Sequence, residues 1–194
     1  EHLSADVLQA VAEGAADLGI CNAAGSAGAL QSLPYRQDRL ILVVPQHHAL
    51  AQQTSVSFEA ALDYDIVGLH AGSSISLAMQ QAAVRASRNL KLRIQVTGLD
   101  AMCRMIDNGL GIGLLPDRAF SLMRGVGQLQ AVTLDDAWAA RELRLVARDF
   151  ATLPTSARLL AEHLTAAATE TITAPAASSD LDLASHCAER PHCP

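Results

Sequence analysis

The chain has 194 residues, of which 50% are apolar and 3% aromatic, and its formal net charge is −6. That length and hydropathy allow one substantial core or two small ones, which excludes a disordered protein. Few aromatic side chains are available to stack on bases, and no run of Lys or Arg follows a phosphate backbone, so the chain alone is not expected to bind DNA. No stretch reaches the roughly 18 apolar residues of a membrane span or has a signal-peptide pattern, so we expect a cytoplasmic protein without membrane contact.

The first part of the chain begins with a helical pattern. Ser4 has the residue type of an N-cap, and Gly14 follows the helix that it would begin. A short buried strand is predicted at 18–20. The run at 40–44 is continuously apolar, which is typical of a strand covered on both faces by helices and indicates a parallel or mixed sheet.

Strand and helix patterns alternate through the rest of the chain. In order they predict a helix at 57–62, a buried strand at 66–69, a helix from 74 to about 88, a half-exposed strand at 91–97, a strand near 129–132, an extended stretch through 138, a strand at 143–147 and a helix at 154–164. This alternation predicts an α/β fold. Beyond it, residues 165–194 lose periodicity and are rich in Ala, Thr, Ser and Pro, so we expect a disordered tail.

The segment 96–118 contains a complete strand, helix, strand unit. Its helix begins after Gly98, and its second strand is predicted at 112–115. The glycine-rich run at 109–113 follows a helix and precedes a strand, which is the reverse of the order in a dinucleotide-binding loop. We therefore interpret its glycines as a tight helix-to-strand turn.

Two helix starts are candidates for binding a small polar or anionic ligand. Ser73 and Ser74 precede one helix, and Thr97 and Gly98 precede another, so each start offers hydroxyl groups and free backbone N–H groups. Simple helix capping is the favoured interpretation of Ser73 and Ser74, and the same ambiguity applies to Thr97 and Gly98. His70 lies at the carboxyl end of a predicted strand, where open α/β sheets bind ligands, although an ordinary surface histidine is an equal alternative.

The sequence offers no catalytic constellation. There is no G-x-S-x-G nucleophile elbow and no credible pairing of a nucleophile with His and a carboxylate, and Cys103 lies on an apolar helical face. The His and Cys pairs at 186–187 and 192–193 are adjacent residues, without the spacing of a zinc site. We therefore expect no enzyme activity, no cofactor and no metal.

Four segments resemble the effector-binding domain of LysR-type transcriptional regulators. They are AVAEGAADLGI at 10–20, YRQDRLILVVPQHHALA at 35–51, VGLHAGSS at 67–74 and IDNGLGIGLLP at 106–116. The resemblance covers residues 1 to about 164. It implies a type 2 periplasmic-binding-protein fold, in which two α/β lobes are joined by two crossover strands.

The same resemblance implies a division of the chain and a set of contacts. Lobe one comprises 1–39 plus 143–164, lobe two comprises 40–142, and the crossovers are 40–44 and 143–147. By the same resemblance, the first strand and helix of lobe one have no counterpart before Glu1. The family's DNA-binding domain is likewise absent there. The positions that match effector contacts are Ser4, His70, Gly72, Ser73, Ser74, Thr97 and Gly98.

The resemblance also implies partners and a mechanism. A small-molecule effector favours one arrangement of the lobes, which changes the geometry of a homodimer or homotetramer. DNA is then bound only through a helix-turn-helix domain absent from this chain. The alternative is a solute-binding protein of a transport system, which shares the fold, and an enzyme on the same fold is a third possibility.

Overall fold

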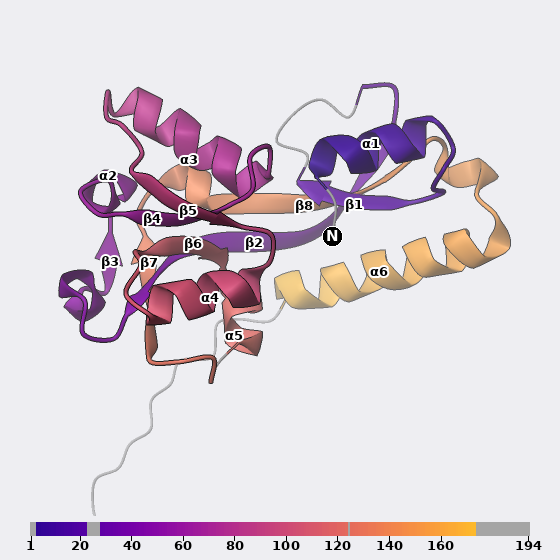
Figure 1. Ribbon diagram of the computed structural model, residues 1–194. Helices are drawn as coiled ribbons and strands as arrows, with labels where there is room; N and C mark the ends of the chain where they lie inside the picture. The colour runs from indigo at the N-terminus through magenta and orange to yellow at the C-terminus, as the bar shows by residue number, and fades with distance from the viewer. Residues whose placement is uncertain (1–2, 23–27, 124, 174–194) are drawn as a thin grey trace, which may run out of the picture.

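The computed structural model describes residues 3–22, 28–123 and 125–173. It is a mixed α/β structure (Figure 1). Its elements are α1 (Ser4–Ala12), β1 (Gly19–Asn22), β2 (Gln31–Pro45), η1 (Ala49–Gln52), β3 (Ser55–Val56), α2 (Phe58–Ala61), β4 (Ile66–Leu69), α3 (Ser74–Arg85), β5 (Leu92–Val96), α4 (Leu99–Asp107), β6 (Gly113–Pro116), α5 (Asp117–Leu122), β7 (Leu129–Leu134), η2 (Ala137–Ala139), β8 (Ala140–Ala147), η3 (Phe150–Thr152) and α6 (Thr155–Thr173).

The long strand β2 is shared by two parts of the sheet. Residues 31–39 pair antiparallel with β8, which also pairs with β1, whereas residues 41–45 pair with β7 and 40–43 with β6. The strand order is β1-β8-β2-β7-β3, with β6 attached to β2 beside this path. A second, parallel pair is formed by β4 and β5. Helices α1 and α3 lie on one side of the long strands, and α4, α5 and α6 lie on the other (Figure 1).

The apolar half of β2 is buried on both faces. Leu40, Leu42 and Val44 belong to a core cluster that includes residues of α2 and α3, whereas Ile41 and Val43 belong to a cluster that includes residues of α4. Successive side chains of a strand point to opposite faces, so a continuous apolar run serves two cores at once. The predicted strand covered on both faces is confirmed.

The glycine-rich turn before β6 packs directly against the backbone of β4. Ile112 donates its N–H to the carbonyl of Asp65 at 2.9 Å and accepts from the N–H of Val67 at 2.8 Å. Gly111 has φ +149°, and a Cβ placed on it would lie 2.4 Å from the Asp65 carbonyl oxygen. The interpretation of this segment as a close-packed helix-to-strand turn is confirmed.

Several element boundaries differ from those predicted. Ser4 is not an N-cap, because α1 begins at Ser4 itself and its N-cap is Leu3, which makes no side-chain cap hydrogen bond. Ile20 of β1 is 41% exposed, so this strand is not fully buried. The stretch through Trp138 forms the 3-10 turn η2, and α3 ends at Arg85 rather than near residue 88.

The start of strand β2 and the end of the last helix also differ from prediction. β2 begins at Gln31, because its polar half pairs with β8 although it has no apolar pattern of its own. The last helix continues to Thr173, so residues 165–173 of the expected disordered tail are helical. The remainder of that tail, with its His and Cys pairs, lies outside the described residues.

We predict that Gly111→Ala lowers the free energy of unfolding by about 3 kcal/mol. The added methyl group would meet the Asp65 carbonyl and would also strain a positive φ. Gly109 is the matched control, since its φ is +73° but nothing lies within 4 Å of its Cβ position. Gly109→Ala should therefore cost only about 1 kcal/mol. Urea denaturation measures both values, and equal losses would contradict the backbone contact.

Candidate functional site

A cavity of about 620 Å³ lies between α1, α3 and β8. Sites for small organic ligands commonly measure roughly 300 to 1,000 Å³, so this one suits a metabolite. One wall is a stripe of α3 and the loop before it. The residues of that wall are Gly72, Ser74, Leu77, Ala78, Gln81 and Arg85.

The α3 wall follows from helix geometry. Ser74, Ala78, Gln81 and Arg85 recur at intervals of three or four residues, which places them on one face of the helix. At 1.5 Å per residue this face extends about 16 Å along the cavity. It is mostly polar, and its first residue stands at the positive end of the helix dipole.

The opposite wall comes from the first helix of the chain. Ser4 and Ala5 begin α1, and Asn22 ends β1. A Cβ placed on Gly72 would lie 3.3 Å from Leu3 Cδ1, so the start of α1 and the loop before α3 are neighbours. Two helix N-termini therefore converge on one cavity, although the pair is α1 and α3 rather than the α3 and α4 starts that the sequence suggested.

The floor of the cavity is the strand β8. Glu142 and Arg144 alternate along it with apolar residues, so their side chains share one face. Arg144 Nε donates to Ser32 Oγ at 3.1 Å, and Nη2 donates to the Ser32 carbonyl at 3.3 Å. Arg144 Nη1 donates to Glu142 Oε1 at 3.0 Å. An arginine thus stands at the floor in a fixed orientation.

An ion pair is buried between the same two strands, and its arginine, Arg141, is also among the residues that line the cavity. Arg141 donates to Asp38 in register across β8 and β2, and their side chains are only 8% and 7% exposed. Within the described part of the chain, Arg141 Nε, Asp38 Oδ1 and Arg36 Nε are buried without a hydrogen-bond partner. Because burial of an unmatched charge costs several kcal/mol, this pair holds the strands in register.

Trp138, in the 3-10 turn η2 just before β8, also lines the cavity. Its indole Nε1 donates to Asp136 Oδ1 at 3.1 Å, and Phe58 N donates to Asp136 Oδ2 at 2.6 Å. The Trp138 ring meets the Phe58 ring edge to face, with centroids 5.2 Å apart. The aromatic wall is therefore held by one carboxylate that also serves the first turn of α2.

The structure brings some of the predicted site residues to the cavity and leaves others beside it. Ser4, Gly72 and Ser74 line it. Ser73 is 8% exposed, and its Oγ accepts from Ser76 N at 3.1 Å, so its hydroxyl caps α3. The capping alternative holds for Ser73, while the neighbouring Ser74 faces the cavity.

The remaining predicted positions lie at the carboxyl ends of β4 and β5. His70 N donates to the Val96 carbonyl at 3.0 Å, which brings His70 next to the turn of Thr97 and Gly98. The side chains of His70 and Thr97 are exposed, and Gly98 is the N-cap of α4. None of these three residues lines the cavity.

Sequence reasoning missed the floor of the site. It treated 143–147 as a connecting strand and gave no role to Glu142, Arg144 or Trp138. The available signal was the pattern ARELRLVA, in which charged residues alternate with apolar ones in a strand predicted to cross between lobes. Charges on one face of a strand that crosses between lobes indicate a position where that face meets a ligand cavity.

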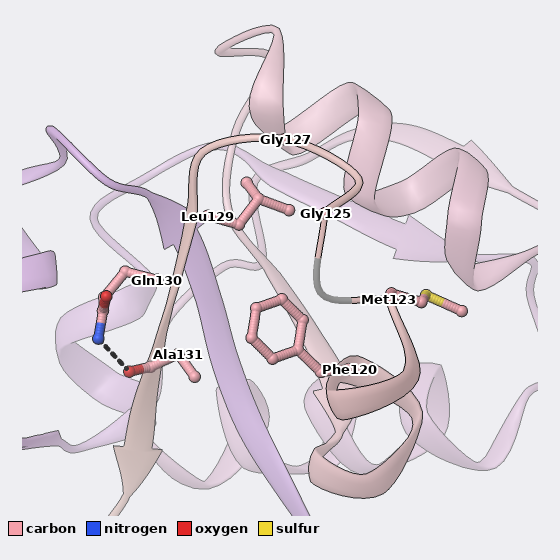
Figure 2. Close-up of a pocket in the computed structure, with 7 residues that line it drawn as sticks. All are labelled: Phe120, Met123, Gly125, Gly127, Leu129, Gln130 and Ala131. Atoms are coloured by element: carbon pink, nitrogen blue, oxygen red, sulfur yellow. Dashed lines mark hydrogen bonds between the residues drawn. The ribbon is translucent and has the colours of Figure 1, made fainter.

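A second cavity of about 330 Å³ lies beneath the loop between α5 and β7, away from every predicted site residue. Figure 2 shows Phe120 and Leu129 pointing into it, while the Gln130 side chain turns back to the Ala131 carbonyl. The loop is tied to α4, because Gln128 N donates to Asp107 Oδ1 at 2.8 Å.

The groups with shifted pKa values lie outside the main cavity. Burial raises the pKa of the Cys21 thiol, and burial together with the charge of Asp100 raises the pKa of Cys103, so both thiols stay protonated at neutral pH. Burial and the neighbouring His47 lower the pKa of His48. Among the described residues, no group of three His, Cys, Asp or Glu side chains is placed to hold a metal, and no helix could cross a membrane.

A mixed α/β fold whose long strand β2 is shared by two parts of the sheet, with a ligand-sized cavity beside it, is typical of a ligand-binding domain of the periplasmic-binding-protein type. Residues 1–169 match the family model described as the LysR substrate binding domain. The chain therefore belongs to this family, the effector-sensing domains of LysR-type transcriptional regulators, which is not an enzyme family. The resemblance found in the sequence is confirmed.

Solved structures of low sequence identity share the fold. The effector-binding domain of QuiR in complex with shikimate matches with a TM-score of 0.75 and 16% identity, over 87% of this chain and 79% of that one. The regulatory domain of Synechocystis PCC6803 CcmR in complex with 2-PG matches with a TM-score of 0.76 and 18% identity, over 86% and 80%.

Curated relatives are similar over a shorter stretch. A probable RuBisCO transcriptional regulator of Trichormus variabilis is 23% identical over 120 residues, which are 60% of this chain and 36% of the relative. One of the same description from Emiliania huxleyi is 24% identical over 122 residues, 61% of this chain and 39% of the relative. The matched part is thus little more than a third of these relatives' length.

We predict that Asp136→Ala lowers the free energy of unfolding by about 1 to 2 kcal/mol and changes the emission of Trp138. The substitution removes the acceptor of both Phe58 N and the indole N–H. Trp138 is the single Trp of the chain, so fluorescence in a urea titration measures both effects. Asp135→Ala is the control, because among the described residues the Asp135 side chain accepts a hydrogen bond from the exposed Ser55 hydroxyl alone, and the substitution keeps its backbone hydrogen bond to Val56. Equal changes in the two variants would contradict this role of Asp136.

Proposed function

We propose that this domain binds a small, polar or anionic metabolite in the cavity between α1 and α3, and that binding modulates DNA recognition by a helix-turn-helix domain of the full-length protein. The single observation that carries the proposal is the cavity of about 620 Å³ in which two helix N-termini and the charged side chains of β8 meet. Free N–H groups and dipoles at such ends favour anionic and hydroxylated ligands. The effector-bound states of QuiR and CcmR support it.

We propose the two lobes in their expected bounds, 1–39 with 143–164 and 40–142. The cavity then lies between them, since α1 and β1 belong to the first lobe and α3 to the second. A ligand that touches both walls binds the closed arrangement more tightly than the open one, so it shifts the population toward closure. The proposed homodimer or homotetramer transmits this change to DNA in the cytoplasm.

A solute-binding protein of a transport system is the second candidate, because the fold is shared. The family match favours the regulator. The two candidates differ in one measurement on the full-length protein. The apparent Kd for operator DNA should change at least about fivefold when the effector is added, as expected for an allosteric coupling. An unchanged Kd, with effector bound to the domain, would favour the transport candidate.

The ligand site is tested with the neighbouring serines of the α3 start. At a ligand concentration of 100 times Kd, binding should raise the Tm by about 5 to 10 °C, which follows from about 2.7 kcal/mol of added stability. Shikimate, succinate and inorganic phosphate are suitable first probes. We expect Ser74→Ala to reduce this shift without lowering the Tm of the free domain, because Ser74 lines the cavity.

Ser73→Ala is the matched control for that experiment. The loss of its cap to Ser76 N should lower the stability of the free domain by about 1 kcal/mol and leave most of the ligand-induced shift. If Ser73→Ala abolishes the shift while Ser74→Ala preserves it, the cavity assignment at the α3 start is wrong.

A further inference from the structure

We propose that the effector carries an oxyanion group, a carboxylate or a phosphate, that binds the guanidinium of Arg144, and that Glu142 competes with the effector for this guanidinium. The inference rests on the proposed function, because it names the ligand chemistry of the same cavity. It concerns Arg144 and Glu142, two residues of the cavity floor that lie on β8, apart from the helix starts.

Arg144 has donors left for a ligand. A guanidinium has five N–H groups. Three hydrogen bonds are formed, two to Ser32 and one to Glu142, which leaves two N–H groups within the described structure. The side chain is 27% exposed and lines the cavity, so a ligand in the cavity can reach the guanidinium. Carboxylates and phosphates match such a planar fork with two parallel hydrogen bonds.

Ser32 orients this guanidinium before a ligand arrives. Its hydroxyl and its carbonyl accept from Nε and Nη2, two atoms of one rigid plane, so the plane cannot rotate freely. A long arginine side chain normally loses rotamer entropy when it binds a ligand, and a side chain that is already held loses less. Arg144 is therefore a preorganised anchor.

Glu142 occupies the position of a competing anion. It lies two residues before Arg144 on the same face of β8, and its Oε1 accepts from Arg144 Nη1. Its side chain is 46% exposed, so it can turn to solvent when another oxyanion takes its place. A neutral ligand does not displace it and gains no ionic contact. The pair consequently selects for anionic ligands and lowers their affinity below that of an unopposed arginine.

Arg85 is the internal control for simple attraction by charge. It lines the same cavity from the last turn of α3, but it is exposed and forms no hydrogen bond or ion pair with any described residue. If positive charge alone recruits the ligand, Arg85 and Arg144 contribute alike. If binding requires a guanidinium held in one orientation, removal of Arg144 lowers the ligand affinity much more than removal of Arg85.

The test uses the domain and a panel in which each acid has a neutral amide of the same shape. Succinate is compared with succinamide, and shikimate with shikimamide. Inorganic phosphate tests whether the site takes a phosphate group instead of a carboxylate. Binding is measured by Trp138 fluorescence and by the Tm. We expect the acids or phosphate to bind and the amides to bind at least about tenfold more weakly, because charge-assisted hydrogen bonds are the stronger kind.

Three variants are expected to change the affinity for the anion that binds, two by lowering it and one by raising it. Arg144→Gln should weaken its binding by about 10- to 100-fold, and Arg85→Gln by less than about threefold, in line with the weakness of exposed ionic contacts. Glu142→Gln should tighten binding by about two- to fivefold. A gain of affinity cannot result from a folding defect, so this variant tests the inference even if Arg144→Gln is unstable.

The outcomes separate this inference from the proposed function. If the amides bind as well as the acids, or if Glu142→Gln leaves the affinity for acids unchanged, the role of the Arg144 and Glu142 pair is overturned while ligand binding in the cavity stands. If no member of the panel changes Trp138 fluorescence or the Tm, the proposed function itself loses its support and this inference falls with it.

Discussion

The antiparallel pairing of β2 with β8 is the constraint on which the other parts of the structure depend. Residues 31–39 of β2 face β8, whereas the following apolar half enters two cores. Burial on both faces fixes the apolar half, residues 40–44. Because the polar half, residues 31–39, continues the same strand, it is held in position without a core of its own. That polar half and β8 can therefore carry a ligand site, and the buried ion pair of Arg141 and Asp38 helps to fix their register.

The site combines two sources of polarity that have different physical properties. The starts of α1 and α3 provide backbone dipoles, which no side-chain substitution removes. The floor provides charged side chains, Arg144 and Glu142, whose identity a single substitution changes. Helix ends can therefore receive many polar groups, whereas the charged side chains of the floor discriminate among such groups.

Much of the fold could be predicted from the sequence because the buried elements have strong patterns. The run at 40–44, the strand at 66–69 and the glycine-rich turn were located correctly. The polar half of β2 was not predicted, since its pairing with β8 is a tertiary interaction without a local signal. At the site, Ser74 was placed on the cavity and Ser73 turned out to be a cap, a distinction that depends on the helix start at Ser74 and not on residue type.

A register shift in β2, between Pro34 and Arg36, has a consequence for the whole ribbon. Strict alternation would place Ser32, Arg36 and Asp38 on one face. The extra residue reverses the alternation, so Ser32 shares the face of Arg144, while Asp38 shares the opposite face with Arg141. One strand thereby supports the Arg144 guanidinium on one face and the buried ion pair on the other. The bulge gives the strand polar side chains on both faces. Deletion of one residue at the bulge would move the side chains of all residues on one side of it to the opposite face of the sheet.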